Sequence, residues 1–205
     1  FFANFRVSIM LDSNGSNTTA AAGVAKLTCS GSLKNKNAVV LAGTGPVGQR
    51  AAAMLAQEGA HVSITSRSFD KAQKACQAIN TRFNVTVNPI EATDNIARAK
   101  AIAQTHIVFA AGAANIQLLE EAHWKDNPTL ELIADANASP PIGVGGTDMM
   151  DRGLNRHGKI IWGSIGFGTL KLALHKACIN QLFESNDQVL DAEEIFRLAK
   201  SMALI

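Results

Sequence analysis

The sequence predicts an α/β fold in which a parallel sheet is flanked by helices. Short apolar runs alternate along the chain with longer segments in which small and apolar residues recur at helical spacing. A glycine-rich turn, GTGPVG at 43–48, joins the apolar run AVVLA at 38–42 to one of these segments. Alternation of this kind is typical of successive βαβ units. Apolar residues make up 47% of the 205 residues, as is ordinary for a globular protein with a real core.

Three elements are predicted before residue 30. RVSIM at 6–10 should form a strand, DSNGSN at 12–17 a polar turn, and TTAAAGVAKL at 18–27 a helix of small residues. Because the chain opens inside an apolar run, we expect an amino-terminal part to be missing from this sequence. Residues 1–28 are therefore predicted to be the remnant of a truncated amino-terminal domain with its linking helix, and residues 29–205 a second domain with carboxy-terminal helices.

The later elements follow the same alternation. Apolar runs predict strands at 38–42, 61–65, 84–88, 106–113, 130–135 and 159–163. Helical spacing predicts helices at 49–59, 69–83, 94–104, 170–184 and 191–203. Asp191, with Glu194 three residues later, should form a capping box at the start of the last helix. GSIGFG at 163–168 is predicted to be a loop.

The glycine-rich turn has the GxGxxG spacing of a dinucleotide-binding loop. Gly43 permits the tight turn, Gly45 lets the backbone approach a pyrophosphate, and Gly48 lets the helix pack on the strand. The phosphates would then meet the free N–H groups at the start of the helix. A purely structural glycine turn is the alternative, but the strand before it, the helix after it and the next strand favour a dinucleotide.

Ser66 and Arg67 stand where an NAD-binding site usually carries a carboxylate. Such a carboxylate accepts hydrogen bonds from both ribose hydroxyls, whereas a cation suits the added phosphate of NADP. Arg67 offers a forked guanidinium, Ser66 a hydroxyl donor and Lys71 a second positive charge. The alternative is that Arg67 only opens a solvated helix. We favour the phosphate role, which predicts NADP as the cofactor, with NAD as an alternative.

Ligands gather at the carboxyl ends of the strands in an open α/β sheet. The small residues of AAGA at 110–113 and of GSIGFG could form walls for ribose and nicotinamide. Asp135 could face the reacting centre or, equally well, cap the loop before Pro140. The complete set of predicted cofactor-binding residues is Gly43, Thr44, Gly45, Pro46, Val47, Gly48, Ser66, Arg67, Lys71, Ala111, Gly112, Gly163, Ile165 and Gly166.

Composition excludes several classes of function. The formal net charge is +2, and the 19 basic residues are scattered, so we expect no nucleic-acid partner. Cys29, Cys76 and Cys178 are dispersed, which predicts buried free thiols in a reducing cytosol and no metal site. No apolar stretch is long enough to predict a membrane span. We therefore expect a cytoplasmic protein, and no histidine has a partner that predicts catalysis.

Several segments resemble the NADP-dependent methylene-tetrahydromethanopterin dehydrogenases of methylotrophic bacteria, some of which also accept methylene-tetrahydrofolate. The segments are MLDSNGSNTTAAAGVAKL at 10–27, VVLAGTGPVGQRAA at 39–52, FDKAQKA at 69–75, ADANASPPIGVGG at 134–146 and GFGTLKLALHKACI at 166–179. The resemblance covers nearly the whole chain, and DSNGSNTTAAAG is its most specific part.

The resemblance implies a substrate-binding amino-terminal domain beside a Rossmann-like NADP-binding domain, with the pterin in the cleft between them. It places the phosphate-binding arginine at Arg67, followed here by Ser68 where a relative has Lys. It also implies that Asp12, Ser13, Asn14 and Asn17 approach the pterin or the nicotinamide. Such enzymes oxidise one-carbon units derived from formaldehyde, and we expect a homo-oligomer.

The reaction that the resemblance implies needs no proton transfer. A hydride leaves the methylene carbon between two nitrogens for the nicotinamide, so catalysis rests mainly on alignment and on tolerance of a cation. Asp12 or Asp135 could stabilise that cation, and no other catalytic residue is predicted. The alternatives are a methylene-tetrahydrofolate dehydrogenase, a shikimate-type dehydrogenase and an NADP-binding sensor without turnover.

Overall fold

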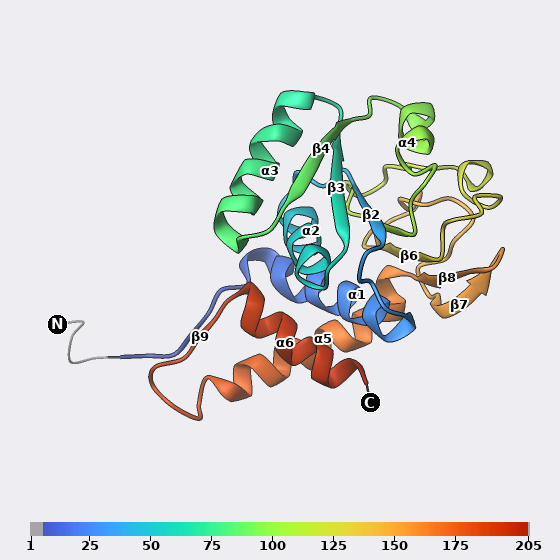
Figure 1. Cartoon of the computed structure of the whole chain (residues 1–205). Helices are drawn as coiled ribbons and strands as arrows, with labels where there is room; N and C mark the ends of the chain where they lie inside the picture. Colours follow the sequence, from blue (N-terminus) through green and yellow to red (C-terminus); the bar gives the residue numbers. More distant parts are fainter. Residues whose placement is uncertain (1–5, 205) are drawn as a thin grey trace.

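A seven-stranded sheet lies at the centre of the computed structural model, which describes residues 6–204 (Figure 1). The strands lie in the order β4, β3, β2, β5, β6, β8, β7, and all neighbours are parallel except β7 and β8. Their bounds are Asn37–Leu41 (β2), His61–Ser66 (β3), Val87–Glu91 (β4), Ile107–Ala110 (β5), Leu132–Asp135 (β6), Arg152–Arg156 (β7) and Lys159–Trp162 (β8). The chain winds outward in opposite directions from β2 and β5, which creates a crevice at their carboxyl ends where ligands bind in such sheets.

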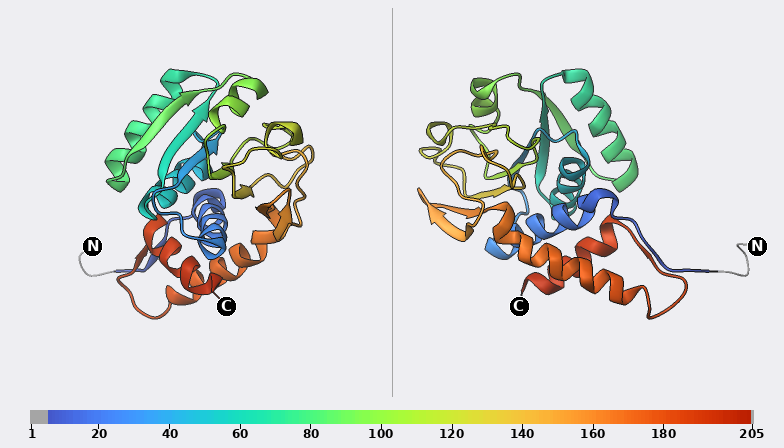
Figure 2. Two further views of the ribbon diagram at one scale, coloured as in Figure 1. Left: turned by 45° about the vertical axis from the view of Figure 1, so that its right-hand side comes forward. Right: turned by 180° about the vertical axis from the view of Figure 1, so that it is seen from behind.

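Helices cover both faces of this sheet. Their bounds are Ser16–Ser30 (α1), Pro46–Gln57 (α2), Phe69–Phe83 (α3), Asn95–Ala101 (α4), Ser164–Gln181 (α5) and Ala192–Ala203 (α6). Alternate strand residues point to opposite faces, so Val40 and Phe109 pack with α1, α2 and α3. Val39 and Val108, on the other face, pack with Ile102 just after α4 and with the segment after β5. Helices α5 and α6 lie outside α1 and cover it (Figure 2). The predicted α/β class is confirmed.

The start of the chain differs from the prediction. The predicted strand at 6–10 is reduced to Ile9–Met10 (β1), which pairs in parallel with Val189–Leu190 (β9), outside the main sheet. This short ladder extends away from the body of the molecule (Figure 1). The prediction was too long because the apolar residues Val7 and Ile9 are exposed and bury no strand face against the core.

The predicted polar turn at 12–17 is shorter than expected and ends at Gly15, with positive φ at Asn14 and Gly15. Ser13–Gly15 forms a 3₁₀ turn and α1 begins at Ser16, because the Asp12 carboxylate accepts hydrogen bonds from the first backbone N–H groups of the helix. The predicted domain boundary at residue 28 falls inside α1, most of which is buried against the sheet and three helices. The division into two domains stays a prediction, and residues 1–5 of the predicted remnant lie outside the described residues.

The observed bounds of other elements differ from the predicted bounds by a few residues, and local interactions explain some of these differences. Asn84 adopts a left-handed conformation that ends α3, so the strand predicted at 84–88 starts at Val87. The strand predicted at 106–113 ends at Ala110. The helix predicted at 94–104 is shorter, because α4 begins after its cap Asp94 and ends at Ala101. The capping box of Asp191 and Glu194 is confirmed.

Three further predictions were wrong or incomplete. GSIGFG is not a loop, because α5 already begins at Ser164. Strand β7 was not predicted, since RGLNR shows no apolar alternation. Cys29 is exposed near the end of α1, although Cys76 and Cys178 are buried as predicted. No helix within residues 6–204 is long and apolar enough to cross a membrane.

Candidate functional site

The three glycines of the turn occupy three different environments. A Cβ on Gly43 would lie 2.8 Å from the Ile64 side chain on β3, and one on Gly48 would lie 2.6 Å from the Cα of Gly43. A Cβ on Gly45 would meet nothing within 4 Å. Gly45 also precedes Pro46, the first residue of α2. Of the three glycines, only Gly45 has open space beside it, so approach of a pyrophosphate there stays a prediction.

Thr65 holds the turn against β3, a role that the sequence analysis missed. Its Oγ1 accepts a hydrogen bond from the Ala42 N–H at 2.9 Å, and its carbonyl accepts one from the Gly43 N–H at 3.0 Å. The Thr65 side chain is buried in this position. The path of the turn is therefore fixed by a threonine one residue before the predicted Ser66.

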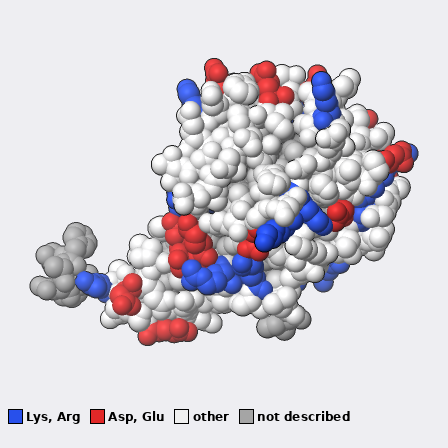
Figure 3. Space-filling view, in the orientation of Figure 1, with Lys and Arg blue, Asp and Glu red and all other residues white. Residues whose placement is uncertain are grey.

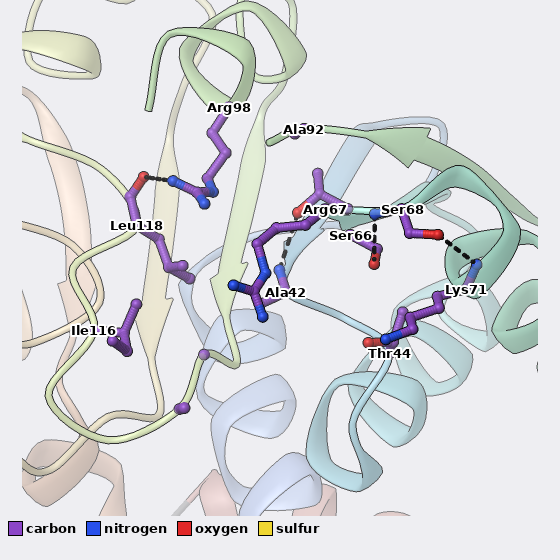
Figure 4. Close-up of a pocket in the computed structure, with 13 residues that line it drawn as sticks. Ala42, Thr44, Ser66, Arg67, Ser68, Lys71, Ala92, Arg98, Ile116 and Leu118 are labelled. Carbon is purple, nitrogen blue, oxygen red and sulfur yellow. Dashed lines mark hydrogen bonds between the residues drawn. The ribbon is translucent and has the colours of Figure 1, made fainter. Parts of the chain in front are cut away.

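A cavity of about 780 Å³ opens beside the turn (Figure 4). Arg67, Lys71 and Arg98 are its cations, and no carboxylate lines it. The other lining residues are small, hydroxylic or apolar: Ala42, Thr44, Thr65, Ser66, Ser68, Ala92, Gly112, Ala113, Ile116 and Leu118. A site with three cations and no acid suits an anionic ligand with an apolar part.

Ser68 starts the helix that presents Lys71 to this cavity. Its Oγ accepts a hydrogen bond from the Lys71 N–H at 3.4 Å, and its own N–H donates to the Ser66 Oγ at 3.3 Å. A serine is a better cap than a lysine for this helix. Ser68 in this chain therefore has a local structural role as the cap of α3.

The structure brings together some of the predicted cofactor-binding residues. Thr44, Ser66, Arg67, Lys71 and Gly112 line the cavity, and the other residues of the turn lie in the adjoining segment. Ala111 follows the end of β5, where its N–H bonds the Leu41 carbonyl at 3.0 Å. Three lining residues were not predicted, because they carry no motif and come close only through the fold: Arg98, Ile116 and Leu118.

Gly163, Ile165 and Gly166 do not line this cavity. A Cβ on Gly163 would lie 2.2 Å from the Asp148 carbonyl oxygen, and one on Gly166 would lie 1.8 Å from that of Asp151. Packing of α5 against the 148–151 backbone thus explains both glycines. Their contact with a nicotinamide stays a prediction.

Asp135 is buried at the end of β6, with only 1% of its surface exposed. Its carboxylate accepts hydrogen bonds from the N–H groups of Asn137 at 3.0 Å and Val144 at 2.9 Å. Burial raises the pKa of this carboxyl, although the backbone N–H donors act in the opposite direction. The geometry favours the second of the two predicted roles, a residue that holds the loop after β6.

The raised pKa of Asp135 predicts a pH dependence of stability. Since the folded state holds the proton more tightly than the unfolded chain, the free energy of unfolding should fall as the pH rises from the ordinary value of 3.8 through the folded pKa, and then level off. Urea unfolding of the wild type and of Asp135→Asn at a series of pH values isolates this contribution. The prediction would be contradicted if the free energy of unfolding of the wild type, relative to that of Asp135→Asn, increased with pH across this window.

The predicted substrate-binding residues surround the start of α1. The Asp12 carboxylate accepts hydrogen bonds from the Asn17 N–H at 2.8 Å and the Thr18 hydroxyl at 2.7 Å, and His175 Nδ1 lies 3.6 Å away. Asn17 is buried, and its side-chain oxygen accepts a bond from Arg50 Nε at 3.0 Å. Asp12, Asn17 and Ser13 line a second cavity of about 410 Å³ with Arg50, whereas Asn14 does not.

Charged groups outside these cavities are mixed in sign. On the face shown in Figure 3, Lys and Arg side chains lie among Asp and Glu side chains, without an unbroken basic surface. Ion pairs such as Arg156–Asp151 and Lys200–Glu58 join several of them. Within residues 6–204, no group of three or more His, Cys, Asp or Glu residues could hold a metal ion.

The parallel sheet, the glycine turn and the cationic cavity define the dinucleotide-binding domain of an NAD(P)-dependent dehydrogenase. Residues 24–136 match the model of the shikimate / quinate 5-dehydrogenase family, and the chain belongs to this family. The cofactor is therefore NAD(P).

Two curated relatives come from Methylorubrum extorquens (strain AM1). The chain is 55% identical over 205 residues to the bifunctional protein MdtA, across 99% of this chain and 71% of that protein. It is 28% identical over 213 residues to the NAD(P)-dependent methylenetetrahydromethanopterin dehydrogenase, across 99% of this chain and 72% of that protein.

Solved structures share the fold at low sequence identity. Quinate dehydrogenase from Corynebacterium glutamicum in complex with NAD has a TM-score of 0.55 at 14% identity, over 91% of this chain and 62% of that chain. Shikimate 5-dehydrogenase from Listeria monocytogenes in complex with shikimate and NAD has a TM-score of 0.54 at 14% identity, over 89% of this chain and 62% of that chain. The chain thus spans less than two thirds of these structures, and the likeness shows the fold alone.

Proposed function

We propose that this chain is the NADP-binding part of a methylene-tetrahydromethanopterin dehydrogenase in one-carbon metabolism. The observation that carries the NADP assignment is the cavity at the end of β3, where Arg67 and Lys71 stand without any lining carboxylate. A carboxylate there would repel a 2′-phosphate, whereas these cations attract it. The pterin assignment is supported by the 28% identical dehydrogenase and by the motif around Asp12.

The residues of this chain would act mainly by positioning. The start of α2, behind Gly45, would hold the pyrophosphate, and Arg67 would hold the 2′-phosphate. NADP, when bound, supplies a nicotinamide ring that accepts a hydride from the methylene carbon. Residues near the second cavity would orient the pterin, with the Asp12 carboxylate stabilising the developing methenyl cation.

A shikimate-type dehydrogenase is the second candidate, because the matching family model bears that description. Oxidation of an alcohol also requires a group that accepts the hydroxyl proton. The two carboxylates considered for catalysis, Asp12 and Asp135, each accept hydrogen bonds from the protein itself. A general-base role would compete with these bonds, which favours the hydride transfer that needs no base.

Initial rates of NADPH formation by the whole protein that contains this chain, measured by absorbance with separate substrates, test this proposal. We expect turnover with methylene-tetrahydromethanopterin, and slower or no turnover with methylene-tetrahydrofolate, shikimate or quinate. Preference for the folate or for shikimate would identify one of the alternatives. Tight NADP binding without turnover of any substrate would instead favour a binding module.

A further inference from the structure

Arg98 enters the nucleotide cavity from α4, on the side opposite the glycine turn (Figure 4). Its Nη1 donates hydrogen bonds to the Asn95 side-chain oxygen at 2.6 Å and to the Leu118 carbonyl at 3.3 Å. These two bonds tie the guanidinium to α4 and to the segment after β5. The planar group is therefore held in a fixed orientation at the cavity wall.

The wall beside Arg98 is apolar. Leu118 is 3% exposed, whereas Ile116 at the mouth of the cavity is 50% exposed. Ala92 and Ala113 are small residues of the same lining. An exposed apolar side chain and a flat cation that line one cavity suit a flat, partly apolar ring more than a phosphate.

The charges of the cavity lead to the same conclusion. Burial lowers the pKa of the Arg98 guanidinium, Asp94 raises it, and the positive charge of Arg67 lowers it further. Arg98 stays protonated, since guanidinium groups do so in proteins. Arg67, Lys71 and Arg98 thus bring three like charges to one cavity whose described lining has no carboxylate, and an electron-rich ring next to Arg98 would be attracted.

We propose that Arg98 is the adenine-stacking residue of this site: its guanidinium lies over one face of the adenine, beside Leu118 and Ile116. This inference rests on the proposed function only in that the adenosine end of the dinucleotide occupies this cavity. The two arginines then have separate tasks. Arg98 serves NAD and NADP alike, because both contain adenine, whereas Arg67 distinguishes them through the 2′-phosphate.

Dissociation constants for NADP and NAD, measured by titration calorimetry, test this division. We expect Arg98→Ala to weaken both dinucleotides by about tenfold, with little change in their ratio. Arg98→Lys keeps the charge and a donor for the Leu118 carbonyl but loses the planar group, so it should bind as weakly as the alanine variant. Arg197→Ala on α6, whose side chain is 74% exposed, is the matched control and should bind like the wild type.

Three results would overturn the inference while leaving the proposed function intact. The first is wild-type affinity in Arg98→Ala, and the second is a loss of affinity for NADP but not for NAD. The third is wild-type affinity in Arg98→Lys, which would mean that Arg98 acts only through its charge or its hydrogen bonds to the protein. Arg98→Lys decides the matter if the alanine variant fails to fold, as judged by its unfolding temperature. Failure of the wild type to bind either dinucleotide would instead reject the proposed function.

Discussion

Replacing Arg67 with Asp is expected to reverse the cofactor preference. The substitution removes the cation at the end of β3 and places a carboxylate where NAD-binding sites usually have one. Loss of a charge-assisted hydrogen bond costs about 1.5–3 kcal/mol, and repulsion between the new carboxylate and the 2′-phosphate adds to this loss. The ratio of kcat/KM for NADP to that for NAD should therefore fall by about 100-fold or more.

Two further variants separate charge from other effects at this position. Arg67→Gln removes the cation without adding an anion, so it should shift the ratio in the same direction but less. Arg197→Asp makes the same change of charge on exposed α6 and should leave the ratio unchanged. The side chain of Arg67 is exposed, so the shift should be largest at low ionic strength. An unchanged ratio in Arg67→Asp would reject Arg67 as the phosphate-binding residue.

Alanine at Gly48 and at Gly45 should have different consequences, although both positions belong to one turn. At Gly48 the new methyl group would lie 2.6 Å from the Cα and 2.9 Å from the carbonyl oxygen of Gly43. These are backbone atoms, so relief requires α2 to move away from the turn. We expect Gly48→Ala to lower the free energy of unfolding by about 1–3 kcal/mol and to abolish dinucleotide binding.

The Gly45 variant separates binding from stability. Nothing lies within 4 Å of a Cβ at this position, and its φ of −78° suits any residue. Gly45→Ala should therefore unfold near the wild-type temperature yet bind NAD and NADP much more weakly, because the methyl group occupies the approach of the pyrophosphate. Thermal unfolding with and without dinucleotide measures both quantities. Wild-type ligand stabilisation in Gly45→Ala would place the pyrophosphate elsewhere.

Most of the sheet and the glycine turn were predictable from local pattern. The runs at 38–42 and 61–65 became β2 and β3, and the helix predicted at 69–83 became α3 with the same bounds. These predictions succeeded because strands buried on both faces are nearly continuous apolar runs, and because caps and glycines act on adjacent residues. The motif at Gly43 and Arg67 likewise needs only the order of strand, turn, helix and strand.

Elements that depend on distant contacts were harder to predict. The start of α5 at Ser164 packs against the backbone of residues 148–151. No local sequence pattern predicts this contact. Strand β9 exists only because Val189 meets Ile9 from the other end of the chain. Arg98 looks like an ordinary helix cation in the sequence, and only the bond to Leu118 shows that it faces the cavity.

Sequence alone determined the α/β class, the dinucleotide turn and the basic residue at the end of β3, because each depends on residues close together in the chain. Tertiary structure decided which side chains share the nucleotide cavity and which carboxylates are already engaged. Asp135 illustrates the difference: its position at the end of a strand suggested a carboxylate that faces the reacting centre as readily as a residue that caps a turn. Its burial and its bonds to the backbone of Asn137 and Val144 favour the turn, because a buried carboxylate that already holds two N–H groups is poorly placed to reach a substrate.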